Sequence, residues 1–418
     1  MRILFLSAFY PPFGPLGWPQ KVQELDRLLQ ARGHTTQVLT SSYGVQQRND
    51  GETESVRRVL SLESDLLHYR HSSVLAYGWR ARRNVAEVES CVRAFGPDVV
   101  FIHVMWNLSP RLAWCVEQLL PGRVVYYMAD HWAYTPDVHT AYWNDPARRP
   151  LRRWLKRMAA PLALGRIERW TKVPLHFDRV LCVSHSIRDR LIRQAGVSPE
   201  NAAVVYYGID TQRFSPASHR DERSAFSLLY AGRVASQKGV RTAVEAVLGT
   251  ARNASRAGDV SLTIVGSGDP EYIESLQQLA HGAPIHFRPA VPYEAMPDLL
   301  REFDALVLPS IWEEPLAGAM LEAMASGVLV IGTTTGGSGE ALVDGETGLT
   351  FPPGDVELLA RQIAYARDHP EMCLSLARRA REVVVQRFDI QRMVSEIERE
   401  LLRVVQSRLS GPPDSRVD

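Results

Sequence analysis

The sequence is short of cysteine, of long apolar runs and of net charge, and each shortage argues against a class of protein. Its 418 residues include four scattered cysteines without paired spacing, which argues against a disulfide framework or a cysteine-based zinc site. No stretch reaches the roughly 18 apolar residues of a membrane-spanning helix. The formal net charge is +1, so no overall field favours nucleic acid or an acidic polymer as a partner.

The first residues do not form the full pattern of a signal peptide. The apolar run that begins at Ile3 stops at Pro11-Pro12, which is too early for such a leader. We therefore expect a cytoplasmic protein whose cysteines stay reduced.

What the sequence does contain is a strand–loop–helix pattern that occurs twice. Apolar runs predict strands at 2–7, 36–40, 99–103, 124–128, 180–183 and 203–206, and again at 226–231, 262–265, 285–288, 305–309 and 328–332. Segments with apolar residues at helical spacing separate these runs. The pattern predicts an α/β protein with two Rossmann-like domains, each with a doubly wound parallel sheet.

A polar, proline-bearing stretch after Phe214 marks the predicted boundary between the two domains. We expect an N-terminal domain at 1–214, a C-terminal domain at 215–388, a last helix at 389–409 and a disordered tail at 410–418. Ligands of doubly wound sheets bind at the carboxyl ends of the strands. The functional residues are therefore expected in strand-to-helix loops that line a cleft between the domains.

The first motif follows the strand at 226–231. It places Gly232 at the strand end and then Arg233 and Lys238 five residues apart in one loop. Two such cations can bind one diphosphate, Arg in bidentate fashion and Lys as a point charge. Two solvated surface cations are the alternative interpretation.

The second motif follows the strand at 305–309. A helix is predicted to start just after Pro315, so Glu314 precedes it and Glu322 lies about two turns in. Free amides of the first turn, at Leu316, Ala317 and Gly318, would form an anion site. An acidic helix start favoured by the helix dipole is the alternative interpretation for either glutamate alone.

Together these residues resemble the retaining glycosyltransferases of family 4, which share the two-domain GT-B fold. The family's Glu-x7-Glu motif corresponds to Glu314 and Glu322, and its Arg/Lys pair to Arg233 and Lys238. The similarity extends from about 180 to 354. It is specific for the superfamily and says little about the acceptor.

The resemblance implies a role for each matched residue. Arg233 and Lys238 would neutralise the donor diphosphate, Glu314 would contact hydroxyls of the donor sugar, and Glu322 the ribose hydroxyls. The implied donor-binding set is Gly17, Gly232, Gly266, Leu316, Ala317, Gly318, Glu322, Gly336 and Gly337. The family usually sends its last helix back to the first domain, which suits 389–409.

The N-terminal half matches the family less well. The family often has adjacent glycines in its first loop, whereas here Gly14 and Gly17 are separated, and Gly17 is the better candidate for approach to the diphosphate. The family also tends to place a histidine at the end of a central strand. We expect Asp130 and His131 to line the cleft, without choosing between them as the sugar contact, and a structural role for the histidine stays open. His103 is a further candidate.

No essential metal or other cofactor is expected. The chain contains no Asp-x-Asp, the carboxylate pair with which many nucleotide-sugar enzymes hold a divalent ion. The Arg/Lys pair and a helix N-terminus can supply the same electrostatic stabilisation.

One basic segment suggests a further partner. Six cations occur between Arg148 and Arg157, and Leu151, Trp154, Leu155, Met158 and Leu162 would share one face of a helix. Such a helix can lie on an anionic membrane, which would place the protein peripherally at the inner face of a membrane. A solvated helix whose apolar stripe packs into its own domain is the alternative.

The sequence therefore predicts a retaining glycosyltransferase that moves a hexosyl or N-acetylhexosaminyl group from a nucleoside diphosphate sugar, most simply a UDP- or GDP-sugar, to an acceptor hydroxyl. The acceptor would be a small molecule, a glycan or a lipid-linked sugar, and no nucleic acid is expected. A GT-B-fold phosphorylase, a nucleotide-sugar epimerase and a non-catalytic protein that binds sugar nucleotides are the alternatives.

Overall fold

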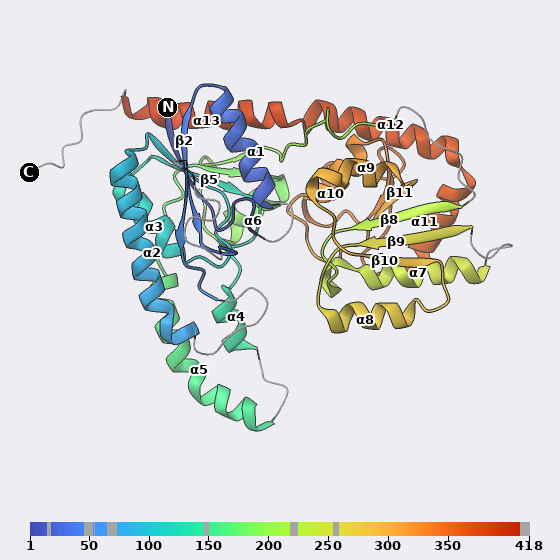
Figure 1. Cartoon of the computed structure of the whole chain (residues 1–418), viewed down its shortest axis with the longest axis horizontal. Helices are drawn as coiled ribbons and strands as arrows, with labels where there is room; N and C mark the ends of the chain where they lie inside the picture. Colours follow the sequence, from blue (N-terminus) through green and yellow to red (C-terminus); the bar gives the residue numbers. More distant parts are fainter. Residues whose placement is uncertain are drawn as a thin grey trace, which may run out of the picture. The chain divides into compact units, whose positions relative to one another are not determined.

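The computed structural model describes residues 1–14, 18–45, 53, 55–64, 73–145, 150–217, 225–253 and 259–409. The chain forms two compact units (Figure 1). Unit 1 holds residues 1–182, 187–204 and the chain from Val394 onward, and unit 2 holds 183–186 and 205–393. The domain limits expected at 214 and 388 stay a prediction.

Unit 1 is built on a parallel sheet of seven strands. The strands are β1 (Arg2–Leu6), β2 (Thr35–Ser41), β3 (Val56–Leu60), β4 (Val99–Ile102), β5 (Val124–Met128), β6 (Val180–Cys182) and β7 (Ala202–Val204), in the order β3-β2-β1-β4-β5-β6-β7. Every neighbouring pair is parallel. The order changes direction between β1 and β4, which is the switch point of a doubly wound sheet.

The edge strand β3 was not among the predicted strands. Its sequence, Val-Arg-Arg-Val-Leu, holds two cations and so has no apolar run. Arg58 is nevertheless buried, and its guanidinium donates to the carbonyl oxygens of Tyr10 and Pro11. Those hydrogen bonds compensate the burial of the Arg58 guanidinium, whereas sequence periodicity would predict that an arginine faces solvent.

Helices cover both faces of this sheet. They are α1 (Trp18–Ala31), α2 (Ser73–Phe95), α3 (Pro110–Leu119), α4 (Val138–Asn144), α5 (Pro150–Thr171), α6 (His185–Gln194) and α13 (Ile390–Leu409). Ser109 and Asp137 cap α3 and α4 with side-chain oxygens that accept from first-turn amides.

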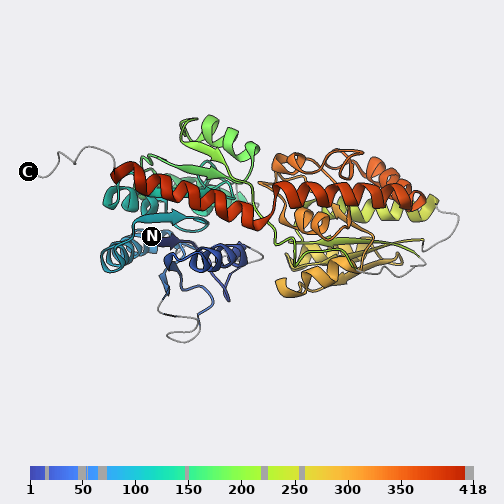
Figure 2. The same cartoon turned by 90° about the horizontal axis from the view of Figure 1, so that it is seen from above.

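The last helix, α13, belongs to unit 1 from Val394 onward (Figure 2). Its Glu398 accepts from Arg32 at 2.8 Å and lies 2.7 Å from His34 Nε2, and its Glu400 pairs with Arg179 at 2.6 Å. These ion pairs fix the helix along unit 1.

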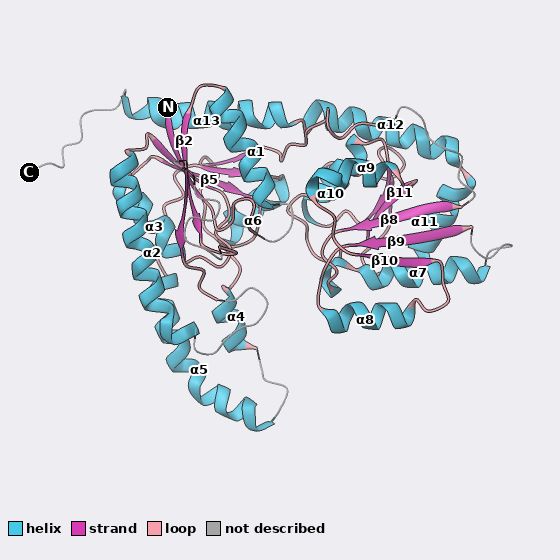
Figure 3. Ribbon diagram, in the orientation of Figure 1, coloured by secondary structure: helices cyan, strands magenta, loops and turns pink. Residues whose placement is uncertain are grey.

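Unit 2 is built on a second doubly wound parallel sheet (Figure 3). Its strands are β8 (Phe226–Ala231), β9 (Val260–Val265), β10 (Ile285–Arg288), β11 (Ala305–Leu308), β12 (Leu329–Gly332) and β13 (Leu349–Thr350), all parallel, in the order β10-β9-β8-β11-β12-β13. The short β13 was not predicted because two residues carry no period. The order changes direction between β8 and β11.

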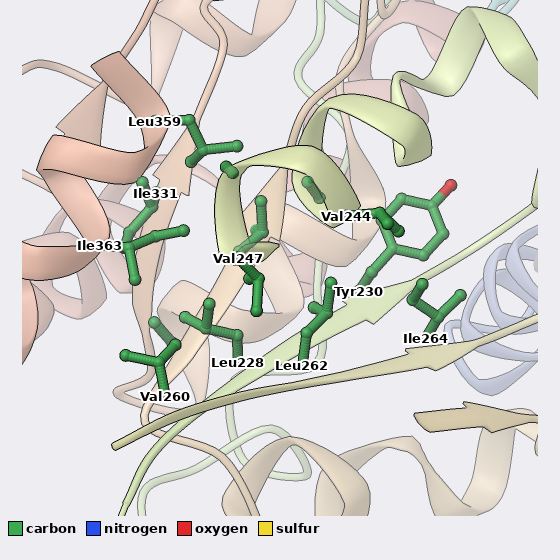
Figure 4. Packing of buried hydrophobic residues seen from close by; sticks show 14 of the residues in the cluster. Leu228, Tyr230, Val244, Val247, Val260, Leu262, Ile264, Ile331, Leu359 and Ile363 are labelled. Carbon is green, nitrogen blue, oxygen red and sulfur yellow. The ribbon is translucent and has the colours of Figure 1, made fainter. Parts of the chain in front are cut away.

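The helices of unit 2 are α7 (Val240–Asn253), α8 (Pro270–Leu279), α9 (Met296–Arg301), α10 (Gly318–Ala325), α11 (Val356–Asp368) and α12 (Pro370–Arg387). Aliphatic side chains of α7 and α11 interdigitate with those of the central strands, as Figure 4 shows for Val244, Val247, Leu228, Leu359 and Ile363. All five are fully buried. This core holds the ends of β8 and β11 in place.

Among the described residues, no helix combines the length and the apolar character that crossing a bilayer would require. The tail predicted at 410–418 lies outside the described residues.

Candidate active site

The loop after β8 carries the first predicted pair of cations. Arg233 is half-buried, and its Nε is a buried donor without a hydrogen-bond partner among the described residues. The Tyr230 hydroxyl donates to the Arg233 carbonyl oxygen at 2.6 Å and so fixes the backbone at that point. Because buried donors in folded proteins almost always have partners, this N–H marks a place where a ligand oxygen would be favourable.

The loop after β11 runs beside the loop after β8. The backbone amides of Ile311 and Trp312 both donate to the carbonyl oxygen of Gln237, at 3.0 and 2.9 Å. Gly239 has φ 66°, and a Cβ there would lie 1.8 Å from the Pro309 carbonyl oxygen. Only glycine permits the two loops to approach this closely.

An ion pair joins the two loops through their side chains. Lys238 Nζ lies 2.6 Å from Glu314 Oε1, and the glutamate is almost fully buried. The hydroxyl of Ser310 donates to the same oxygen at 2.5 Å. Sequence reasoning assigned no role to Ser310. The available signal was a polar residue at a strand end, four positions before the glutamate.

Charge and burial also act on Tyr230. Burial, reinforced by the nearby Glu314 carboxylate, raises the pKa of the Tyr230 hydroxyl well above its ordinary value, and Arg233 acts in the opposite direction. Tyr230, Arg233 and Glu314 therefore belong to one electrostatic neighbourhood at the switch point of unit 2.

The helix after this loop starts later than predicted. It begins at Gly318, and Leu316 and Ala317 lie before it as buried, non-helical residues. The carbonyl oxygen of Glu314 accepts from the Gly337 amide at 2.7 Å instead of from the first turn of a helix. Glu322 lies on α10 and is buried.

The glycines of the loop after β12 pack on the Glu314 segment. A Cβ at Gly336, which has φ 62°, would lie 2.2 Å from the Glu314 carbonyl oxygen. A Cβ at Gly337 would lie 2.1 Å from the Pro315 carbonyl oxygen and 2.7 Å from Ser184 Cβ. This loop therefore determines where the Glu314 backbone lies.

The loop after β9 supports the Arg233 segment in the same way. A Cβ at Gly266 would lie 1.8 Å from the Gly232 carbonyl oxygen. The Val234 amide donates to the Ser267 carbonyl oxygen at 2.8 Å. Four strand-to-helix loops thus meet at the carboxyl edge of this sheet. They bring together Lys238 with Glu314, Gly266 with Gly232, and Gly336 and Gly337 with Glu314.

Unit 1 places its candidates at the carboxyl end of β5. Asp130 and His131 are both nearly buried. Burial raises the pKa of Asp130 to about 7, and a hydrogen bond from the Trp132 backbone acts in the opposite direction. His131 Nδ1 shares a hydrogen bond with the Tyr134 hydroxyl.

The other candidates of unit 1 are His103 and Gly17. His103, at the end of β4, is buried against the Tyr127 ring, and burial lowers its pKa to about 4, so it is neutral at pH 7. Gly17 lies outside the described residues.

Comparison with known proteins gives two adjoining family matches. Residues 21–213 match Glycosyltransferase Family 4, and residues 225–368 match Glycosyl transferases group 1. The glycogen synthase of Mycobacterium tuberculosis is 27% identical over 406 residues, covering 94% of this chain and 92% of that protein.

Two solved structures share the fold. Sucrose-phosphate synthase from Thermosynechococcus elongatus has a TM-score of 0.71 at 19% identity, covering 97% of this chain and 99% of that one. Anabaena HepE in complex with UDP-glucose has a TM-score of 0.65 at 19% identity, covering 97% of this chain and 100% of that one. These likenesses confirm the predicted pair of Rossmann-like domains.

We expect Gly337→Ala to lower the melting temperature and weaken donor binding, because the new Cβ would collide with backbone at Pro315 and displace Glu314. Gly249→Ala is the matched control: it lies within α7, and a Cβ there meets nothing within 4 Å. Helix propensity predicts that this control leaves stability unchanged or raises it by about 1 kcal/mol. Equal melting temperatures for the two variants would contradict the packing role of Gly337.

Proposed function

Because this chain belongs to the group 1 glycosyltransferases of family 4, which use nucleotide sugars, we propose that it transfers the sugar of a UDP- or GDP-sugar to an acceptor hydroxyl with retention of configuration. The acceptor would be a small metabolite, a glycan or a lipid-linked sugar. The observation that carries the proposal is the Lys238–Glu314 pair beside the unpartnered Arg233 Nε at the switch point of unit 2.

The proposed donor site has two kinds of contact: cations that bind the diphosphate and carboxylates that bind hydroxyls. Arg233 and Lys238 stabilise the negative charge that builds up on the departing diphosphate. Lys238 can do so while it pairs with Glu314, since an ammonium has three N–H donors and the carboxylate uses one. Glu314 accepts from hydroxyls of the donor sugar, and Glu322 from those of the ribose.

The proposed reaction needs no nucleophile from the protein. The bond from the anomeric carbon to the diphosphate oxygen breaks, and the acceptor oxygen bonds to the same face of that carbon. The acceptor proton passes to the departing diphosphate oxygen. Positioning and electrostatic stabilisation then supply the catalysis.

Asp130 and His131 are included in the proposed site, and neither is assigned as the sugar contact; Gly17, expected near the diphosphate, lies outside the described residues. A carboxyl with a pKa of about 7, as at Asp130, can accept a hydrogen bond from a sugar hydroxyl or donate one to it near neutral pH. The Nδ1 atom of His131 shares a hydrogen bond with the Tyr134 hydroxyl, which orients the imidazole ring.

We expect Arg233→Ala to lower turnover about a hundredfold or more, because the variant loses charge stabilisation of the leaving diphosphate. The donor is first chosen from UDP-, GDP-, ADP- and dTDP-sugars by the rise in melting temperature, and product is then measured. Arg361→Ala is the control, since Arg361 is an exposed arginine on α11. Turnover of Arg233→Ala close to that of the control would refute the proposed donor site.

We further propose that transfer needs no divalent metal. Within the described ranges, no three His, Cys, Asp or Glu side chains are grouped as a metal site would require, and the two cations of the β8 loop can take over the charge of the diphosphate. Activity should therefore survive dialysis against EDTA. Loss of activity that Mn²⁺ or Mg²⁺ restores would overturn this part of the proposal while leaving the donor site itself intact.

A further inference from the structure

The most exposed large hydrophobic side chains of the described chain gather on two helices of unit 1. Leu75 and Trp79 on α2 are 70% and 63% exposed. The others lie on α5, and their exposed fractions are Leu151 71%, Trp154 60%, Leu155 53%, Met158 64% and Leu162 82%. Isolated exposed leucines are ordinary, but a contiguous group of this kind marks an interaction site.

The five side chains of α5 form one continuous strip, which we call the α5 apolar face. Their spacing of three and four residues places them within about a quarter of the helix circumference. The opposite side of the helix is occupied: Ala163 and Ile167 pack with Val74 in a small core. The alternative in which the apolar strip packs into its own domain is therefore wrong, because different residues fill that contact.

The helix pair is rigidly joined behind this face. A Cβ at Gly78 of α2 would lie 2.9 Å from Trp170 Nε1 of α5, so the two helices touch at that point. The first turns of α5 extend beyond the sheet of unit 1 in Figure 1. The apolar face is thus presented on a supported helix.

The charge around the α5 apolar face has one sign. The cations of α5 are Arg152, Arg153, Lys156, Arg157, Arg166 and Arg169, and its only acid is Glu168. Arg153 and Arg157 are exposed beside the apolar strip, and Lys156 donates to the Asp145 carbonyl oxygen and lies over the Tyr142 ring. A partner for this face must therefore offer an apolar layer bordered by negative charge.

We propose that the α5 apolar face docks on the surface of an anionic lipid bilayer. Leucine and methionine would enter the boundary between headgroups and acyl chains, Trp154 suits that boundary, and the flanking cations would lie against lipid phosphates. A second copy of the chain fits poorly, because face-to-face pairing would bring two sets of cations together. Docking would carry the enzyme to acceptors held in a membrane.

The test uses the full-length protein and sedimentation with vesicles of phosphatidylcholine, with and without phosphatidylglycerol, at low and high salt. We expect binding to the anionic vesicles only, weakened by salt. Leu155→Glu combined with Met158→Glu should abolish sedimentation, and Arg157→Glu should weaken it about tenfold or more. All three positions are exposed, so melting temperatures should match that of the wild type.

Matched controls lie on helices of unit 2. Met372→Glu and Arg361→Glu change an exposed methionine on α12 and an exposed arginine on α11, and both should leave sedimentation unchanged. No binding to anionic vesicles at low salt would overturn the proposal, as would equal losses in the controls. Dimers that form without vesicles and disappear in the double variant would assign the face to a second copy instead. Sugar transfer to a soluble acceptor should be unaffected, which separates this test from that of the proposed function.

Discussion

The ion pair between Lys238 and Glu314 joins the loops that follow the two central strands of unit 2. Its position follows from topology, because β8 and β11 are neighbours at the point where the strand order changes direction. The close approach needs glycine at 239, and the Glu314 backbone needs glycine at 336 and 337. The cations and carboxylates of the proposed donor site are thus placed by backbone contacts that few other residues would permit.

The residues of the proposed donor site lie in short loops next to strongly apolar strands, which made the loops themselves predictable from the sequence. Arg233, Lys238 and Glu314 were identified from spacing and from the resemblance to a family, and the structure brings the last two into contact. The start of α10 was predicted two residues too early. Pro315 favours a first helical turn, but the hydrogen bond from the Gly337 amide, distant in sequence, holds the Glu314 carbonyl outside the helix.

Other features could not be predicted because they depend on distant partners. Strand β3 contains the buried Arg58, whose guanidinium donates to the carbonyl oxygens of Tyr10 and Pro11. The apolar strip of α5 is evident from periodicity, but periodicity does not show which side of the helix packs against the rest of unit 1. That outcome depends on Ala163 and Ile167, which take the contact with α2 and leave the strip exposed. The proposed donor site and the proposed membrane contact thus depend on different residues, the first in unit 2 and the second in unit 1.

The central claim, that Lys238 and Glu314 act as one unit in donor binding, is tested most directly by a double-mutant cycle. Titration calorimetry would measure the affinity of the identified nucleotide sugar for the wild type, Lys238→Met, Glu314→Gln and the double variant. We expect each single change to weaken binding, and the loss in the double variant to be clearly smaller than the sum of the two. Losses that simply add, or a single variant with wild-type affinity, would contradict the account.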